Sequence, residues 1–86
     1  MIFDNKRRES EIIYELLLSA QDGIKKTRLM YKANMTYTQF SKYLDFLIEK
    51  DLLIENDSNS NGKIYNLTEN GKKLLEPLDV MFTFLK

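Results

Sequence analysis

The stretch of sequence that decides the fold runs from residue 36 to residue 50 and reads TYTQFSKYLDFLIEK. Thr36 and Gln39 have the spacing of a capping box, in which two side chains satisfy backbone groups at the start of a helix. The apolar residues that follow recur at the spacing of one helical face, which predicts an amphipathic helix over 36–50. These apolar residues are Phe40, Tyr43, Leu44, Leu47 and Ile48.

The opposite face of this helix changes character along its length. Its first two turns carry hydroxyl, amide and ammonium groups, and carboxylates begin only at Asp45. A helix that enters the major groove of DNA by its amino-terminal end needs this arrangement, because its leading turns meet base edges and phosphates. An amphipathic core helix with an ordinary solvated face shows the same pattern, so the flanking sequence has to decide between the two. The polar residues of the leading turns are Thr38, Gln39, Ser41 and Lys42.

The segments before residue 36 complete a helix-turn-helix pattern. Apolar periodicity predicts a first helix over about 4–21, which the turn signal Asp22-Gly23 ends. A shorter helix is predicted over about 26–32, and Asn34 suits a left-handed exit from it. Two helices joined by three or four residues, the second one capped and amphipathic, are typical of a helix-turn-helix.

After residue 50 the periodicity changes from that of a helix to that of strands. Residues 52–55 and 63–67 predict two short strands, and the loop between them reads NDSNSNG, a composition typical of turns. A β-hairpin directly after a capped helix is the wing of a winged-helix domain. A flexible linker without a partner is the alternative interpretation of this loop.

The last helix is predicted to begin at Glu69, after its cap Thr68. Pro77 lacks a backbone donor, so we expect it to bend or break this helix into the pieces 69–76 and 77–86. The last nine residues, LDVMFTFLK, contain six apolar side chains. Such an end either folds back over the domain or packs against another subunit.

The element order of three helices, a hairpin wing and a C-terminal helix predicts an α+β fold of the winged helix-turn-helix type, with residues 1–86 as a single domain. The formal net charge is zero, which argues mildly against a general nucleic-acid coat protein. Five basic residues and no acidic one nevertheless lie between residues 23 and 44. A second basic cluster is Lys6, Arg7 and Arg8. Local cations of this kind are sufficient for phosphate contacts.

Composition excludes several classes of function. The sequence has no cysteine and no histidine, which excludes disulfides, thiol nucleophiles, imidazole bases and Cys/His zinc sites. The acidic residues are dispersed along helix surfaces, so we expect neither an enzyme nor a cofactor, metal or small-molecule substrate. No apolar run approaches the roughly 20 residues of a membrane span, and the start MIFDNKRRESE is not a signal peptide. We therefore expect no membrane partner and a cytoplasmic location.

Two stretches of the chain resemble a known family. GIKKTRLMYKANMTYTQFSKYLDFLIEKDLLIE and YNLTENGKKLLEPL are similar to small archaeal winged-helix DNA-binding regulators, over residues 23–78. The resemblance implies a homodimer that binds duplex DNA as a transcription factor or chromatin-associated protein, with a recognition helix at 36–50 and a wing at 56–63. Two departures stand out: Asp51 replaces the glycine that usually ends the recognition helix, and Lys63 is the one basic residue of the wing.

Under the DNA-binding hypothesis, the helix tip meets base edges, and Thr36 and Tyr37 touch the sugar-phosphate backbone. The upstream cations hold flanking phosphates, and the wing reaches the adjacent minor groove. The alternatives are a winged-helix protein-protein interaction module, which zero net charge and a weakly basic wing favour, and a non-specific chromatin-associated protein. The predicted DNA-binding residues are Lys25, Lys26, Arg28, Lys32, Thr36, Tyr37, Thr38, Gln39, Ser41, Lys42, Asn59, Asn61 and Lys63.

A homodimer is predicted separately, from apolar side chains that one small core does not need. Tyr14 and Leu18 lie on a spare face of the first helix, and the chain end 68–86 supplies the rest, which makes it the predicted dimerisation element. Pairing these residues across a two-fold axis would place two recognition helices on one side of the duplex. The rival is a fold-back of the chain end onto the first helix. The predicted interface residues are Tyr14, Leu18, Leu78, Met81, Phe82, Phe84 and Leu85.

Overall fold

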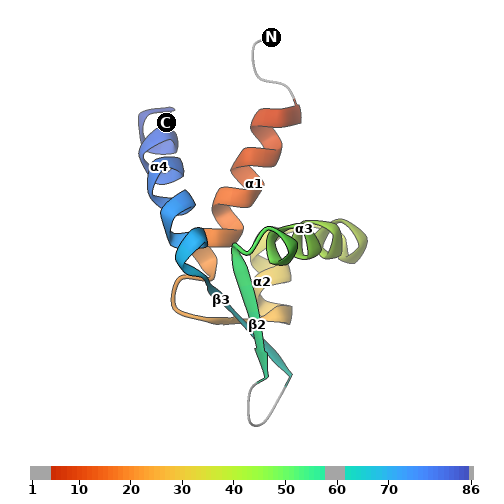
Figure 1. The fold of residues 1–86 in the computed structure, drawn as a ribbon. Coiled ribbons are helices and arrows are strands. Elements are labelled where there is room, and N and C mark those ends of the chain that lie inside the picture. The colour runs from red at the N-terminus through yellow and green to blue at the C-terminus, as the bar shows by residue number, and fades with distance from the viewer. Residues whose placement is uncertain (1–4, 58–61, 86) are drawn as a thin grey trace.

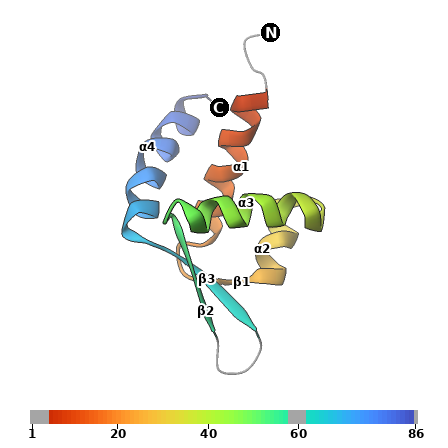
Figure 2. The ribbon, with the colours of Figure 1, turned by 45° about the vertical axis from the view of Figure 1, so that its right-hand side comes forward.

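The computed structural model describes residues 5–57 and 62–85, with side chains from Arg8 onward. It has the predicted order of three helices, a hairpin and a last helix (Figure 1), with one additional short strand, β1 (Figure 2). The hairpin points away from the end of the molecule where the first and last helices lie (Figures 1 and 2). The elements are α1 (Asn5–Ser19), β1 (Ile24–Lys25), α2 (Lys26–Ala33), α3 (Tyr37–Glu49), β2 (Leu53–Asp57), β3 (Lys63–Leu67) and α4 (Glu69–Leu85).

The sheet has three antiparallel strands in the order β1-β3-β2. β2 and β3 form the predicted hairpin, in which Asp57 lies opposite Lys63. The sequence pattern does not predict β1, because two residues are too few to show the alternation of a strand. Ile24 of β1 pairs with Tyr65 of β3, so this strand ties the start of α2 to the middle of the hairpin.

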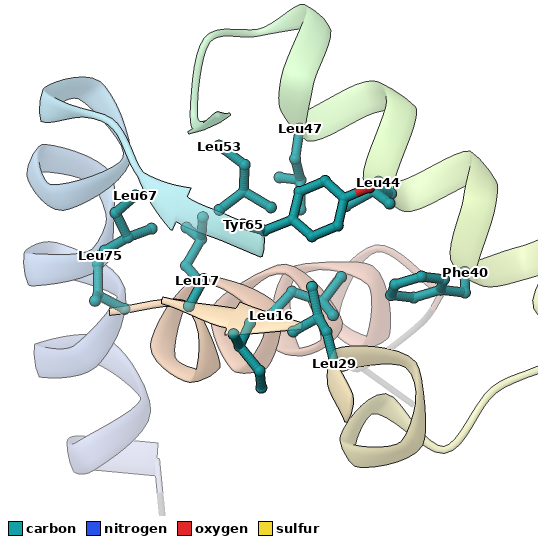
Figure 3. Packing of buried hydrophobic residues seen from close by; sticks show 12 residues of the cluster. Leu16, Leu17, Leu29, Phe40, Leu44, Leu47, Leu53, Tyr65, Leu67 and Leu75 are labelled. Carbon is teal, nitrogen blue, oxygen red and sulfur yellow. The ribbon is translucent and has the colours of Figure 1, made fainter. Parts of the chain in front are cut away.

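The core lies where the helices meet the sheet (Figure 3). Tyr65 of β3 and Phe40 of α3 are its largest members, and both are fully buried. The predicted apolar face of α3 is the one that packs inward. Burying one large apolar side chain contributes about 1.5–3 kcal/mol to stability. The buried apolar residues are Leu16, Leu17, Ala20, Ile24, Leu29, Phe40, Leu44, Leu47, Leu53, Tyr65, Leu67, Leu75 and Phe82.

Thr68 joins the end of α3 to the start of α4. Its hydroxyl accepts a hydrogen bond from the N–H of Gly71 (2.9 Å), as a helix cap does, and donates one to the carbonyl of Asp51 (2.5 Å). Its own N–H donates to the carbonyl of Leu52 (3.2 Å). Asp51 has a φ of 59°, the left-handed conformation that favours glycine. Asp51 therefore keeps the turn that a glycine would make, and its carboxylate accepts a hydrogen bond from the side chain of Asn70 (3.0 Å).

Helix α4 continues through Pro77, so the expected separation into two pieces is wrong. Proline removes one backbone hydrogen bond from a helix. Leu75 and Phe82, on either side of the proline, are both buried. Packing on both sides therefore offsets the lost hydrogen bond and holds the two halves in one helix.

The chain end packs along α1, which gives two of the predicted interface residues a partner within the chain. The ring of Tyr14 stacks on that of Phe82, with centroids 5.0 Å apart and an interplanar angle of 26°. The Tyr14 hydroxyl also donates a hydrogen bond to Asp79 (2.6 Å). Tyr14 and Phe82 thus have partners within one chain, as the fold-back alternative requires. Leu18, by contrast, is exposed.

Gly71 gives a test of the junction between α3 and α4. A Cβ atom at this position would lie 2.2 Å from the carbonyl oxygen of Leu52, which is backbone and has little freedom to move. We expect Gly71→Ala to lower the free energy of unfolding by about 1–3 kcal/mol, measured by urea denaturation. Glycine to alanine inside an exposed helix usually stabilises.

Lys73→Ala, at an exposed position on the same helix, is the matched control. It should change the free energy of unfolding by no more than about 0.5 kcal/mol. A Gly71→Ala protein as stable as the wild type would show that α4 does not need its close approach to the segment after α3.

Candidate nucleic-acid interface

The turn between α2 and α3 presents the start of α3 at the surface. Asn34 adopts the predicted left-handed conformation (φ 53°, ψ 52°), and its N–H donates to two carbonyls in the last turn of α2. Thr36 then caps α3, since its hydroxyl accepts a hydrogen bond from the N–H of Gln39 (3.2 Å). The position of the helix start is therefore set by local hydrogen bonds.

The outer side of the first two turns of α3 is open to solvent. Ser41 is half-buried, and the first turn contains no acidic residue. The free N–H groups and the dipole at a helix start favour a negatively charged ligand such as a phosphate. The carboxylates begin at Asp45, about two turns after the start of the helix. The predicted contact residues that are exposed here are Thr36, Tyr37, Thr38, Gln39 and Lys42.

Three of the predicted cations gather on the outer side of α2 and β1. Lys25, Arg28 and Lys32 line one open hollow together with Thr27 and Tyr31. The fourth cation, Lys26, points elsewhere, because its Nζ lies 5.6 Å from the ring centroid of Tyr37 at the start of α3. A cation at this distance from an aromatic ring is attracted to its face. Lys26 therefore connects the basic side of α2 to the tip of α3.

Lys42 lies on a different part of the surface, toward α1. It lines a hollow with Gln39, Phe46, Ile13 and Glu9. Gln39 also borders a second hollow, to which α1 contributes further carboxylates. The predicted cations therefore do not share one hollow. Lys42 lies on the α1 side of α3, where acidic residues are close, and of the three cations on the outer side of α2 only Lys32 also borders a hollow with α1 carboxylates.

The wing differs most from the expected picture. Lys63 is paired with Asp57 (2.8 Å) and lies 3.7 Å from Glu55. The hydrogen bond to Asp57, followed by the charges of Asp57 and Glu55, raises the pKa of Lys63 above its usual value. Its charge is thus compensated within the hairpin. Asn59 and Asn61, the other predicted wing contacts, lie outside the described residues.

The tyrosine next to this pair connects the wing to the core. Tyr65 is fully buried, and its hydroxyl donates a hydrogen bond of 2.5 Å to Glu55. Burial, followed by the hydrogen bond to Glu55 and its charge, raises the pKa of Tyr65 far above its usual value. The base of the wing therefore depends on a protonated phenol.

Two exposed aromatic residues near the interface are absent from the predicted sites. Tyr31 of α2 and Phe46 of α3 both point outward, and the Nζ of Lys50 lies 5.9 Å from the Phe46 ring centroid. The positions of these two residues on their helices could have identified them from the sequence. Tyr31 follows Arg28 by three residues and so shares its outer face, and Phe46 falls outside the apolar stripe of its helix.

The comparisons with known proteins agree with this geometry. A family model described as winged helix-turn-helix matches residues 6–86. The chain belongs to the winged helix-turn-helix family. This membership and the observed element order confirm the predicted fold. Within the described ranges, the winged-helix chain has no helix that is both long and apolar enough to cross a membrane.

Three relatives illustrate the similarity. An uncharacterized protein of Methanocaldococcus jannaschii, MJ0287, is 40% identical over 81 residues, which cover 93% of this chain and 78% of the relative. The structure of Sso10a-2, a DNA-binding protein from Sulfolobus solfataricus, is 31% identical with a TM-score of 0.75, covering 87% of this chain and 78% of that one. The structure of F93 from STIV, a winged-helix DNA-binding protein, is 27% identical with a TM-score of 0.71 and covers 88% of each chain. The resemblance to archaeal winged-helix proteins is confirmed.

The raised pKa of Tyr65 predicts how stability depends on pH. The folded state favours the protonated phenol, so Tyr65 contributes fully to the free energy of unfolding below a pH of about 10, the pKa of an unfolded tyrosine. This contribution is lost as the pH rises further. Tyr65→Phe should therefore flatten the alkaline fall in the free energy of unfolding, measured by urea denaturation across this range. Some fall should persist, because the hydrogen bond to Asp79 raises the pKa of Tyr14 and burial raises that of Tyr43.

Tyr31→Phe, which removes a hydroxyl from an exposed ring, is the control for this experiment. It should follow the wild-type curve. An alkaline limb that is equally steep in the Tyr65→Phe protein would contradict the role of the buried phenol.

Proposed function

We propose that this protein binds duplex DNA with the tip of α3 in the major groove and acts as a transcriptional regulator. The observation that carries the proposal is the capped, acid-free and open start of α3. Its exposed hydroxyl, amide and ammonium groups match the hydrogen-bonding groups that base edges present in the major groove. The inner face of the same helix is fixed in the core, so these groups are held on a rigid element.

The cations of α2 would hold the phosphates beside the groove. Arg28 and Lys32 are exposed on one side of α2, and Lys26 lies against the ring of Tyr37 at the start of α3. In a helix-turn-helix the first helix crosses the DNA backbone while the second enters the groove. The position of these cations on α2 suits that role, since phosphate contacts fix orientation and base contacts give specificity.

The wing would contribute less than in a strongly basic winged helix. Lys63 is compensated by Asp57 and Glu55, which leaves the described part of the hairpin without a free cation. We therefore assign the main contacts to α2 and α3. A neutral wing can still follow the shape of a groove, which gives specificity without direct contacts to base edges.

The relatives support a binding function of this kind. Sso10a-2 and F93 are both described as DNA-binding proteins, and each matches most of this chain. Membership of the winged helix-turn-helix family points to binding rather than catalysis. The balanced charge and the paired Lys63 favour a second candidate, a module that binds another protein. The DNA-binding candidate predicts binding to DNA that weakens as the salt concentration rises, whereas the protein-binding module predicts no retention on DNA.

DNA binding is tested by fluorescence anisotropy with a labelled duplex over a series of salt concentrations. About five phosphate contacts predict a slope of log affinity against log salt of roughly −4 to −5. Arg28→Ala should weaken binding and reduce the size of this slope by about 1, because one phosphate contact is lost. Lys42→Ala should also weaken binding.

Lys73→Ala on α4 is the matched control, since it removes the same charge from an exposed position on another element. It should leave both the affinity and the slope nearly unchanged. If Arg28→Ala and Lys42→Ala bind like the control, the assignment of the interface is wrong. If the wild-type protein is not retained on DNA at low salt, the protein-interaction module becomes the better explanation.

We also propose that the regulator is a homodimer that pairs through α4. Leu74, Leu78, Met81 and Leu85 follow one another at spacings of four, three and four, the heptad pattern of paired helices. The first two are half-buried, and Met81 and Leu85 remain exposed together with Phe84, at 83% exposure. This end of α4 lies away from the hairpin (Figures 1 and 2), so pairing there leaves the wing free.

Leu18 fits this interface less well than the α4 residues. It lines a hollow with Lys72, Glu76 and Asp79, which lie on the polar side of α4 rather than on the heptad stripe. A two-fold interface centred on α4 would therefore leave Leu18 outside its apolar centre.

The dimer is tested by sedimentation equilibrium of the wild type and of a Met81→Glu/Leu85→Glu double variant. We expect a dimer for the wild type and dimerisation at least about tenfold weaker for the variant, because a carboxylate in an apolar interface has to be desolvated. Point substitutions suit this test better than truncation after Glu76, which would also remove Asp79 and Phe82, the partners of Tyr14. Leu18→Glu is the control and should remain a dimer. A wild type that sediments as a monomer would refute the proposal.

A further inference from the structure

One aromatic side chain of α2 is more exposed than a structural role requires. Tyr31 is 87% exposed, the highest value among the large apolar and aromatic side chains of the described residues. Within the same part of the chain, its hydroxyl makes no hydrogen bond and its ring stacks on no other ring. Tyr31 therefore adds nothing evident to the stability of the fold.

The surroundings of Tyr31 are cationic. It lines an open hollow with Lys25, Arg28, Lys32 and Thr27. Arg28 precedes it by three residues, a spacing that places both side chains on one face of a helix. No carboxylate of the described residues lines this hollow. Lys32, at its edge, also borders the neighbouring hollow that Glu9, Glu11 and Glu15 of α1 line, whereas Lys25 and Arg28 do not. The surface thus combines an open ring with positive charges on either side.

This combination has a specific chemical meaning. A duplex hides the faces of its bases in the stack and offers a protein only base edges, sugars and phosphates. Phosphates alone, whether in a duplex or in a polyanion, need the cations and not the ring. A single strand offers phosphates and also the flat faces of unpaired bases, which stack on exposed aromatic side chains in a positively charged groove.

We propose that the outer face of α2, centred on Tyr31, is a binding site for single-stranded nucleic acid. It shares Arg28 and Lys32 with the proposed duplex interface but not the polar tip of α3, and Tyr31 belongs to this site alone. One unpaired base stacks on the ring of Tyr31, and Lys25, Arg28 and Lys32 hold the phosphates on either side of it. Stacking of this kind tolerates any base, so the site selects unpaired strands rather than a sequence.

Fluorescence anisotropy at low salt tests the site with three labelled probes: an oligothymidylate and an oligouridylate of about 15 nucleotides each, and a duplex. Tyr31→Ser should weaken binding of a single strand at least about fivefold, the lower end of what one stacked base contributes. Binding of the duplex should change less than about twofold. Comparison of the two single strands shows whether the site takes DNA, RNA or both.

Two matched variants separate this site from the duplex interface. Tyr31→Phe keeps the stacking surface and should bind single strands like the wild type. Lys42→Ala, at the tip of α3, should weaken binding of the duplex while leaving single strands unaffected. The two proposals therefore fail in different measurements. If the duplex proposal is wrong, Lys42→Ala binds the duplex like the wild type; if the present proposal is wrong, Tyr31→Ser binds single strands like the wild type.

The proposal is wrong if the wild type binds neither single strand, or if Tyr31→Ser binds single strands like the wild type. It is also wrong if Tyr31→Ser weakens the single strand and the duplex equally, because Tyr31 would then act on the duplex backbone. An independent measurement is the NMR shift of the Tyr31 ring protons, which should move upfield when a base stacks on the ring. The far-UV circular dichroism of each variant, which should match the wild type, shows that the exposed substitution has not altered the fold.

Discussion

The side chain and backbone of Thr68 join the end of α3 to the start of α4, the two helices that the proposed function uses. Its hydroxyl accepts a hydrogen bond from the N–H of Gly71 in the first turn of α4 and donates one to the carbonyl of Asp51, just after the end of α3. The backbone of the same residue bonds to Leu52, against which Gly71 packs without room for a Cβ atom. These contacts fix the direction in which α4 leaves the domain relative to α3. In a dimer that pairs through α4, they would therefore determine how the two recognition helices are oriented toward one duplex.

Local chemistry made much of this fold predictable. Thr36 and Thr68 are helix caps in the structure as in the sequence pattern, and Asn34 takes its left-handed conformation, because each acts through bonds to near neighbours. The features that the sequence did not reveal depend on distant partners. Strand β1 exists because Ile24 meets Tyr65, and α4 stays whole at Pro77 because residues on both sides of the proline are buried.

The candidate site shows the same division. The polar, acid-free tip of α3 was predictable, because helical periodicity places its residues on one face. The compensation of Lys63 was not, because it requires the register that sets Asp57 directly opposite Lys63. That register is known only once the length of the turn is known, since a slip by one residue would move the carboxylate to the other face of the sheet. A lysine that the sequence suggests is free to bind a phosphate can thus be paired with carboxylates of its own hairpin.

The charged pair at the hairpin has a consequence for how the protein behaves in concentrated solution. β2 is one of the two edge strands of the sheet, and Ile54 on it is exposed. An edge strand of this kind offers unpaired backbone groups to a strand of a neighbouring molecule. Charged side chains along such an edge oppose this pairing, and Glu55 and Asp57 lie on β2 itself. By this principle, the carboxylates that pair with Lys63 would also oppose edge-to-edge aggregation. A more basic wing, gained by removing them, would come with a greater tendency to form insoluble sheets.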